Sequence, residues 1–196
     1  MASEAETRIA DALHTGAQSL DLSDLELRSL PDSLRRLSML TELDLGVNLL
    51  AELPDWIGDL SALTSLNLFA NPLTTLPDSL GDLTALTELI VSSNQLTELP
   101  DSLGRLTALT VLEASDNLLT KLPDSIGDLA GLTFLQINGN HLVALPDSMR
   151  NLSALTELWI DDRLLPQLPA PLREVVPRAL PAGPPGDDPL SGEPPW

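Results

Sequence analysis

The stretch Leu86-Thr87-Glu88-Leu89-Ile90-Val91-Ser92-Ser93-Asn94 recurs with variations along most of the chain. Pro follows Leu at a constant interval of 23 residues, and Asn keeps the same interval. The prolines are Pro31, Pro54, Pro77, Pro100, Pro123, Pro146 and Pro169, and the asparagines are Asn48, Asn71, Asn94, Asn117 and Asn140. A phase kept over seven units, between about Ala17 and Leu172, predicts one structural unit stacked on copies of itself.

Each unit contains Leu-x-Leu, as in Leu43-Asp44-Leu45, which predicts a short strand with Leu pointing inward and x outward. Equivalent strands should pair in a parallel sheet, ~4.8 Å apart. The segment after Leu-Pro predicts a short helix or 3₁₀ turn. Neighbouring helices need ~8–10 Å, so we expect the stack to bend with the sheet on its concave side. Each Asn falls at the turn after the strand, where its amide can satisfy backbone groups of adjacent units.

These motifs resemble the leucine-rich repeat family in its 23-residue bacterial form of the Leu-Pro type, similar to the repeat half of Roc-type and plant or animal Ras-group proteins. The resemblance implies an α/β repeat fold, a right-handed solenoid of seven repeats with a concave parallel sheet and short helices or 3₁₀ turns outside. Residues 8–23 are similar to the entry of bacterial repeat proteins, some of which carry a Roc-type GTPase. No Gly-x-x-x-x-Gly-Lys-Ser/Thr loop follows, so we expect only the binding half of such a protein.

The predicted organisation has four parts. Residues 1–16 form an N-terminal capping helix, in which Ile9 and Leu13 lie on one face. Residues 17–172 form the seven repeats, and residues 173–180 form a C-terminal cap. Residues 181–196 are rich in Pro, Gly and acidic residues, a composition typical of a disordered tail.

The composition argues against several function classes. Asp and Glu number 29 against 10 Lys and Arg, for a net charge of -19, which disfavours binding to nucleic acid or to anionic membranes. The absence of Cys excludes disulfides, thiolate metal sites and cysteine nucleophiles. No apolar run reaches the ~18 residues of a membrane span, and the acidic N-terminus does not resemble a secretory signal. The sequence therefore predicts a cytoplasmic protein.

Catalytic and metal sites have little support. Nothing in the repeat pattern places a Ser and a carboxylate near His14 or His141, as a catalytic triad would require. The Asp after each Pro forms a ladder: Asp32, Asp55, Asp78, Asp101, Asp124 and Asp147. A divalent cation could relieve their repulsion, but we favour a role at the start of each helical turn, where a carboxylate meets free N–H groups. We therefore predict no catalytic residue, no metal and no cofactor.

The concave face offers the best candidate site, because its outward residues vary between repeats. Phe69, Ile90, Val111 and Phe134 form an oblique apolar stripe across the repeats, with Trp159 nearby and carboxylates around it. Such an arrangement is typical of partner-binding surfaces, and exposed Phe and Trp are typical anchors. The simpler interpretation is that scattered exposed apolar residues are ordinary. We predict that the partner-binding residues are Asp44, Phe69, Glu88, Ile90, Val111, Glu113, Phe134, Gln136, Glu157, Trp159 and Asp161.

The sequence thus predicts a non-enzymatic, monomeric protein–protein interaction module, with a role in intracellular signalling. We expect its partner to be a basic protein with an apolar anchor, attracted by long-range charge. One alternative is a bacterial effector that uses the same face on a host protein. A calcium-binding or enzymatic role is a weaker alternative.

Overall fold

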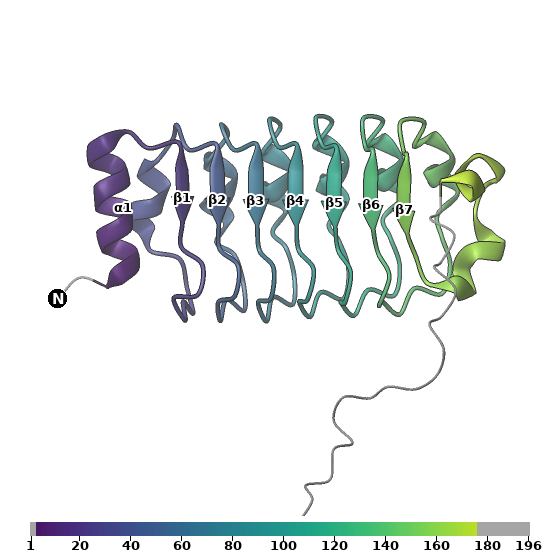
Figure 1. Ribbon diagram of the computed structural model, residues 1–196, viewed down its shortest axis with the longest axis horizontal. Helices are drawn as coiled ribbons and strands as arrows, with labels where there is room; N and C mark the ends of the chain where they lie inside the picture. Colours follow the sequence, from purple (N-terminus) through teal and green to yellow (C-terminus); the bar gives the residue numbers. More distant parts are fainter. Residues whose placement is uncertain (1–2, 176–196) are drawn as a thin grey trace, which may run out of the picture.

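The computed structural model describes residues 3–175, which form one helix, seven strands and a series of short 3₁₀ helices (Figure 1). The strands form one parallel sheet in the order β1 to β7. Helix α1 is Glu4–Thr15, and the strands are β1 (Ser19–Asp21), β2 (Glu42–Asp44), β3 (Ser65–Asn67), β4 (Glu88–Ile90), β5 (Val111–Glu113), β6 (Phe134–Gln136) and β7 (Glu157–Trp159). The 3₁₀ helices are η1 (Asp32–Arg36), η2 (Asp55–Asp59), η3 (Asp78–Asp82), η4 (Asp101–Arg105), η5 (Asp124–Asp128), η6 (Asp147–Asn151), η7 (Asp162–Gln167) and η8 (Ala170–Glu174).

The predicted solenoid class is confirmed, with a parallel sheet on one side and 3₁₀ turns on the other. In every strand the middle Leu is buried, and each strand residue pairs with its equivalent 23 residues later, as in Leu89 with Leu112. Leu side chains of successive coils therefore fill one continuous core, which runs from Ala5 in α1 to Leu172. Most of the predicted C-terminal cap and the whole predicted tail, residues 176–196, lie outside the described residues.

The repeated Asn joins each coil to the one before it, as predicted. Asn94 is buried, and its Nδ2 donates to the carbonyl oxygens of Leu68 and Val91, both at 3.0 Å. Its Oδ1 accepts from the backbone N–H of Leu73 in the preceding coil, at 3.2 Å. Asn48, Asn71, Asn117 and Asn140 make the equivalent bonds. One side chain thus bonds to backbone groups of two coils, and the Leu73 N–H has no other acceptor among the described residues.

The turns opposite the sheet pack more closely than the expected helix spacing of ~8–10 Å, so that expectation is wrong. Gly81 in η3 lies against Ser102 in η4, and a Cβ on Gly81 would overlap the Ser102 carbonyl oxygen. The same Gly and Ser contact recurs at Gly58 with Ser79, Gly104 with Ser125 and Gly127 with Ser148. Because Gly and Ser are small, one backbone can touch the next. Between packed α-helices, larger side chains keep the backbones apart.

The Asp after each Pro begins a 3₁₀ turn, as predicted, but it makes no hydrogen bond to the free N–H groups there. The N-cap position of η1 to η6 is the preceding Pro, and no side chain makes a capping hydrogen bond there. Asp78 and Asp101 are exposed first residues of their turns. The predicted ladder therefore lies on the surface, with each carboxylate close to the start of a helical turn but without a hydrogen bond to its backbone N–H groups. Asp147 pairs instead with Arg150 of the same turn, at 3.2 Å.

The first and last coils differ from the others because each lacks one neighbour. Helix α1 covers the β1 end of the stack, where Ile9 is fully buried (Figure 1). At the other end Arg163 occupies the Asn position, and its guanidinium donates to the Asn140 carbonyl oxygen at 2.5 Å. The last coil therefore keeps a bond to the coil before it with a different side chain.

We predict that Asn94→Ala lowers the free energy of unfolding by about 1–3 kcal/mol, because it leaves the Leu73 N–H buried without an acceptor and removes one of the two amide bonds to the Leu68 carbonyl. Urea denaturation followed by circular dichroism measures the loss. Gln95→Ala is the matched control, since Gln95 is an exposed neighbour. Equal stabilities for the two variants would contradict the proposed role of the Asn ladder.

We predict that Gly81→Ala destabilises the protein by about 1–3 kcal/mol or more, because the added methyl group overlaps the next backbone. Gly131→Ala is the control, since the nearest atoms to its Cβ would be carbonyl oxygens at 3.6 and 3.7 Å. Ser102→Ala should be tolerated, because the buried Ser102 hydroxyl makes no hydrogen bond among the described residues. Thermal unfolding of the three variants decides whether small size or the hydroxyl matters.

Candidate functional site

The candidate site is the solvent-facing side of the sheet, opposite the 3₁₀ turns, and we call it the sheet face. Within β5 the side chain of Leu112 is buried, whereas its neighbours Val111 and Glu113 are half-exposed. The same alternation holds in β3, β4 and β6, because successive residues of a strand point to opposite sides. The predicted outward residues of the strands are therefore on one face.

The apolar residues of the sheet face come from adjacent strands. Val111 pairs with Phe134, and Gln136 pairs with Trp159, so β5, β6 and β7 bring the two aromatic residues together on one side of the sheet. Ile90, Val111 and Phe134 are half-buried, and none of them belongs to the core. Phe69 follows β3 and is 42% exposed. The predicted stripe is thus present as a surface feature, and its central members also pack partly on their neighbours.

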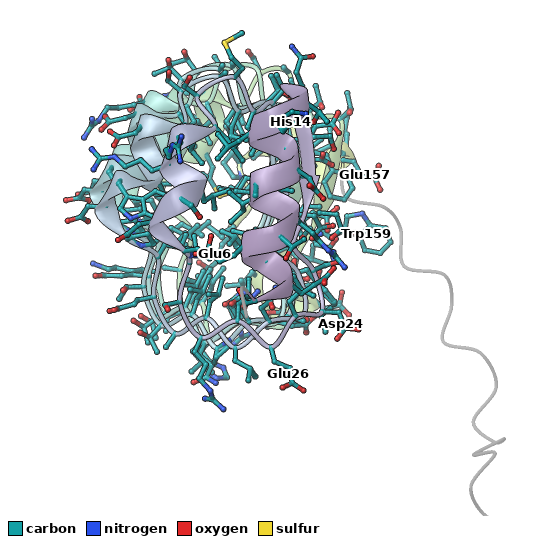
Figure 2. The ribbon with its side chains drawn as sticks, turned by 90° about the vertical axis from the view of Figure 1, so that its left-hand side faces the viewer. Glu6, His14, Asp24, Glu26, Glu157 and Trp159 are labelled. Carbon is teal, nitrogen blue, oxygen red and sulfur yellow. The ribbon has the colours of Figure 1, made fainter. Side chains whose placement is uncertain are left out.

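Trp159 is the most accessible anchor on the sheet face. Its side chain is 44% exposed, and its indole Nε1 donates to Glu157 Oε1 at 2.7 Å. Figure 2, viewed from the α1 end, shows Trp159 and Glu157 projecting from the sheet face. This bond fixes the ring and satisfies its one donor, so that the ring surface is left for apolar contact.

The outward positions form three columns across the repeats: the first residue of each strand, the third residue of each strand, and the second residue after it. These columns begin at Ser19, Asp21 and Ser23 and end at Glu157, Trp159 and Asp161. Carboxylates surround the apolar residues, and no Lys, Arg or His occupies the three outward columns. The seven carboxylates of these columns are Asp21, Glu42, Asp44, Glu88, Glu113, Glu157 and Asp161. A groove of about 370 Å³ lies over β1 to β4, and Asp21, Glu42, Asp44 and Glu88 line it. The sheet face therefore carries a negative potential across its first strands.

Several of these carboxylates also have structural roles that sequence reasoning missed. Asp44 Oδ1 accepts from the Gly46 N–H at 2.8 Å and from Asn67 Nδ2 at 3.1 Å, which shapes the turn after β2. Asp21 accepts from Ser23 in the same way, and these bonds lower the pKa of Asp21. The spacing of two residues between Asp and the bonded N–H is a signal that could have indicated these turns.

Three further predicted residues, Glu88, Gln136 and Asp161, also make hydrogen bonds within the protein. Glu88 accepts from the Ser65 hydroxyl at 2.8 Å, and Gln136 donates to the Ser115 hydroxyl at 3.3 Å. Asp161 accepts from the Gly139 N–H at 3.0 Å and pairs with Arg163, just beyond the edge of the sheet. These side chains are held in place before any partner arrives.

Glu113 differs from the other carboxylates. It is half-buried between Ile90 and Gln136, and among residues 3–175 its carboxylate has no hydrogen-bond donor or cation within bonding distance. Burial raises the pKa of Glu113, and the negative charge of Glu88 raises it further. Its ionised form is therefore less favourable than that of an exposed Glu.

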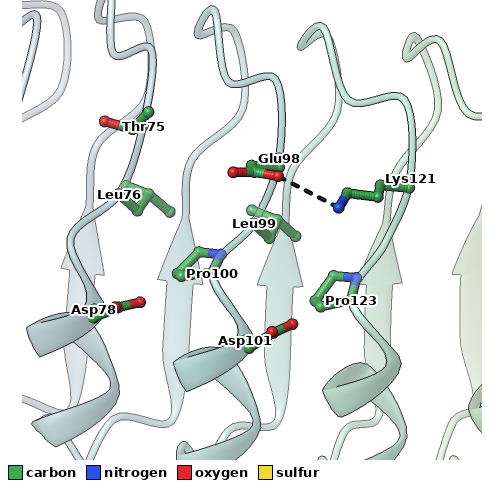
Figure 3. Close-up of a pocket in the computed structure, with 9 residues that line it drawn as sticks. All are labelled: Thr75, Leu76, Asp78, Glu98, Leu99, Pro100, Asp101, Lys121 and Pro123. Atoms are coloured by element: carbon green, nitrogen blue, oxygen red, sulfur yellow. Dashed lines mark ion pairs between the residues drawn. The ribbon is translucent and has the colours of Figure 1, made fainter.

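A second groove, of about 460 Å³, lies away from the sheet face where the chain enters η3 to η5 (Figure 3). Leu76 and Leu99 line it together with Pro100, and an ion pair of 3.6 Å joins Glu98 to Lys121 at its side. Most of its residues belong to the constant Leu-Pro-Asp motif of each repeat. The groove is thus a product of stacking, whereas the variable residues gather on the sheet face.

The described part of the chain holds no cluster of metal-ligating side chains and no membrane-spanning helix. Within the described ranges, no three His, Asp or Glu side chains lie close enough together to hold a metal ion. His14 lies near the end of α1, and His141 follows the Asn140 turn, so the two histidines are on different parts of the surface. Between residues 3 and 175, no helix has the length and apolar character to cross a membrane.

Comparison with known proteins identifies the repeats. The sequence profile of the leucine rich repeat matches residues 84–142, and a second leucine rich repeat profile matches residues 62–83. No curated protein matches the sequence at a significant level.

Solved structures share the fold. A leucine-rich repeat protein of Leptospira interrogans is 30% identical, with a TM-score of 0.66 over 85% of this chain and 49% of that one. YopM from Yersinia enterocolitica is 37% identical, with a TM-score of 0.68 over 81% of this chain and 32% of that one. The plant peptide hormone receptor RGFR1, solved in complex with RGF2, is 34% identical, with a TM-score of 0.65 over 73% of this chain and 24% of that one.

The chain spans about half or less of the length of these proteins, so the likeness concerns their repeats. The profiles, the 23-residue interval and the seven stacked coils agree with one another. The chain therefore belongs to the leucine-rich repeat family.

Proposed function

We propose that this chain is a non-enzymatic binding module whose sheet face takes up a basic protein partner with an apolar anchor. The observation that carries the proposal is the group of Val111, Phe134 and Trp159 on a face whose outward columns hold seven carboxylates and no Lys, Arg or His. Arg163, just outside these columns, pairs with one of the seven, Asp161. Apolar side chains that face away from a complete Leu core add nothing to that core. A partner that covers them gains from their burial.

The geometry favours an anchor at the β5 to β7 end of the sheet face. Trp159 is already held by Glu157, so little side-chain freedom is lost when a partner covers the ring. The groove over β1 to β4 holds most of the negative charge, at the other end of the same face. Basic side chains of the partner would lie over that groove while an apolar side chain contacts Trp159 and Phe134.

Glu113 supports a cationic partner independently of the aromatic residues. Its charge is poorly solvated and repelled by Glu88, which makes the free protein less stable than it would be with a neutral residue there. A Lys or Arg placed between Glu88 and Glu113 would offset both costs by its attraction to the two carboxylates. Residues that reduce stability and face a partner surface are common at functional sites.

The comparisons support a binding role at a coarser level. RGFR1 is a peptide hormone receptor and was solved in complex with RGF2, and this chain resembles about a quarter of its length. We carry over only the idea that such repeats bind proteins or peptides. Basic character of the partner, a monomeric state, a role in signalling and a cytoplasmic location are parts of our proposal that rest on the sequence.

We predict that the double variant Phe134→Ala/Trp159→Ala weakens partner binding by more than ~2 kcal/mol, because it removes both aromatic anchors. Affinity capture with the wild-type chain identifies the partner, and titration calorimetry with the purified partner measures the loss. The partner should also associate more slowly at high salt, since long-range charge accelerates the encounter.

The matched control is Met39→Ala/Val143→Ala, which removes two apolar side chains that are 66% and 77% exposed and lie outside the sheet face. Both double variants should unfold near the wild-type temperature. Unchanged affinity in the Phe134 and Trp159 variant would refute the assignment of the anchor.

We predict that Glu113→Gln raises the melting temperature at neutral pH. A raised pKa means that the folded protein prefers the neutral acid, so stability falls as the pH rises through the folded pKa of Glu113. The difference between variant and wild type should disappear as the pH falls below the ordinary Glu value of 4.5, where both side chains are neutral. Scanning calorimetry over this pH range measures it.

The same variant should bind a basic partner more weakly, because it removes a carboxylate that the partner would neutralise. Glu52→Gln is the control, since Glu52 is exposed and lies outside the strands. A lower melting temperature for Glu113→Gln at neutral pH would show that the charge of Glu113 stabilises the fold, against our interpretation.

A further inference from the structure

A second exposed apolar surface lies at the turns that follow β2 and β3. Val47, Leu49 and Phe69 are 51%, 39% and 42% exposed, and we call these three residues the apolar corner. The Val47 N–H donates to the Phe69 carbonyl oxygen at 2.8 Å, so the two turns lie directly side by side. Among residues 3–175, three of the seven exposed large apolar side chains are in this corner.

Val47 has a backbone conformation that does not suit its side chain. Its φ is 54°, in the left-handed region, where a side chain branched at Cβ meets the backbone. The equivalent residues of five other repeats also have positive φ, and none of them is branched at Cβ with methyl groups. They are Asp24, Ala70, Ser93, Asp116 and Gly139. Val47 is the one β-branched aliphatic residue at this position of the repeat.

Nothing inside the molecule compensates for this strain. Val47 is half-exposed and does not belong to the core, so its methyl groups gain little from packing. The backbone around it is fixed by the buried Asn48, whose amide bonds to three carbonyl oxygens. The protein therefore holds a strained apolar side chain at its surface, which is a cost to the free chain.

The charges around the apolar corner indicate what would cover it. The preceding coil lies alongside, since the Asp24 N–H donates to the Gly46 carbonyl and the Leu49 N–H to the Leu27 carbonyl. That coil carries the exposed Asp24 and Glu26. Figure 2 shows both near the bottom of the view, below Trp159. Asp44 lies on the sheet side, and Arg28 is the one cation of the preceding turn.

We propose that the apolar corner is a docking surface for a short amphipathic segment of a protein partner, with two apolar side chains next to Lys or Arg. The apolar pair would cover Val47 and Leu49, and the cations would face Asp24 and Glu26. A second copy of this chain fits poorly, because the same carboxylates would meet and the whole chain has a charge of -19. The surface shares only Phe69 with the sheet face, so it goes beyond the function proposed above.

The test uses the full chain with isotope-labelled Val, Leu and Ile methyl groups and a synthetic peptide that has two Leu flanked by Arg. Titration should shift the Val47 and Leu49 methyl signals and saturate. A peptide with Glu in place of Arg should leave them unmoved. Absence of a saturable shift at Val47 and Leu49 overturns the proposal. Shifts confined to Ile90 and Val111 also overturn it, and they would leave the sheet-face function intact.

Variants separate the strain from the contact. Val47→Asn introduces a residue that tolerates positive φ, so it should raise the melting temperature. It also removes the apolar side chain, so it should weaken peptide binding at least tenfold. Ser93→Asn is the matched control at the equivalent position, and it should leave peptide binding unchanged. A lower melting temperature for Val47→Asn would show that the Val47 backbone is not strained. Unchanged peptide affinity would show that the Val47 side chain does not contact the peptide, against the proposal.

Discussion

Every coil of this protein must stack on the next at the spacing of paired strands, and the rest of the structure depends on that constraint. On the sheet side, backbone hydrogen bonds set the spacing. At the turns, the buried Asn amide bonds across two coils. On the opposite side, the contact between Gly and Ser brings the 3₁₀ turns close enough to follow the sheet. One interval of 23 residues therefore serves three different kinds of contact.

Because the Leu, Asn, Gly and Ser positions are committed to stacking, the outward columns of the sheet are free to vary. In the first three repeats Asp21, Asp44 and Asn67 shape the turns that follow their strands, and the carboxylates there also give the face its charge. From β4 onward the column changes to Ile90, Glu113, Gln136 and Trp159. The two ends of the sheet face thus differ in chemistry, which is why we assign charge recognition to one end and apolar anchoring to the other.

We expect two residues to reduce the stability of the free chain, for different physical reasons. Glu113 has a carboxylate that is poorly solvated, and Val47 has a branched side chain on a left-handed backbone. Both are partly accessible, and neither is needed for the stacking contacts. A chain that tolerates such costs on two different sides of the same solenoid is consistent with two contact surfaces.

The sequence by itself determined the repeat, the parallel sheet, the Leu core and the role of Asn, because each of these depends on spacing within one unit. It also separated inward from outward positions, since alternation in a strand needs no knowledge of neighbouring coils. Tertiary structure alone decided the contact of Gly with Ser, the missing cap at Asp78 and its equivalents, and the left-handed backbone of Val47. The contact of Gly with Ser depends on how closely two coils approach, and the other two features depend on the backbone conformation of each turn. The repeat interval specifies neither. The sequence could propose which residues face outward, but only the folded chain shows how exposed each one is and which of its polar atoms are already bonded.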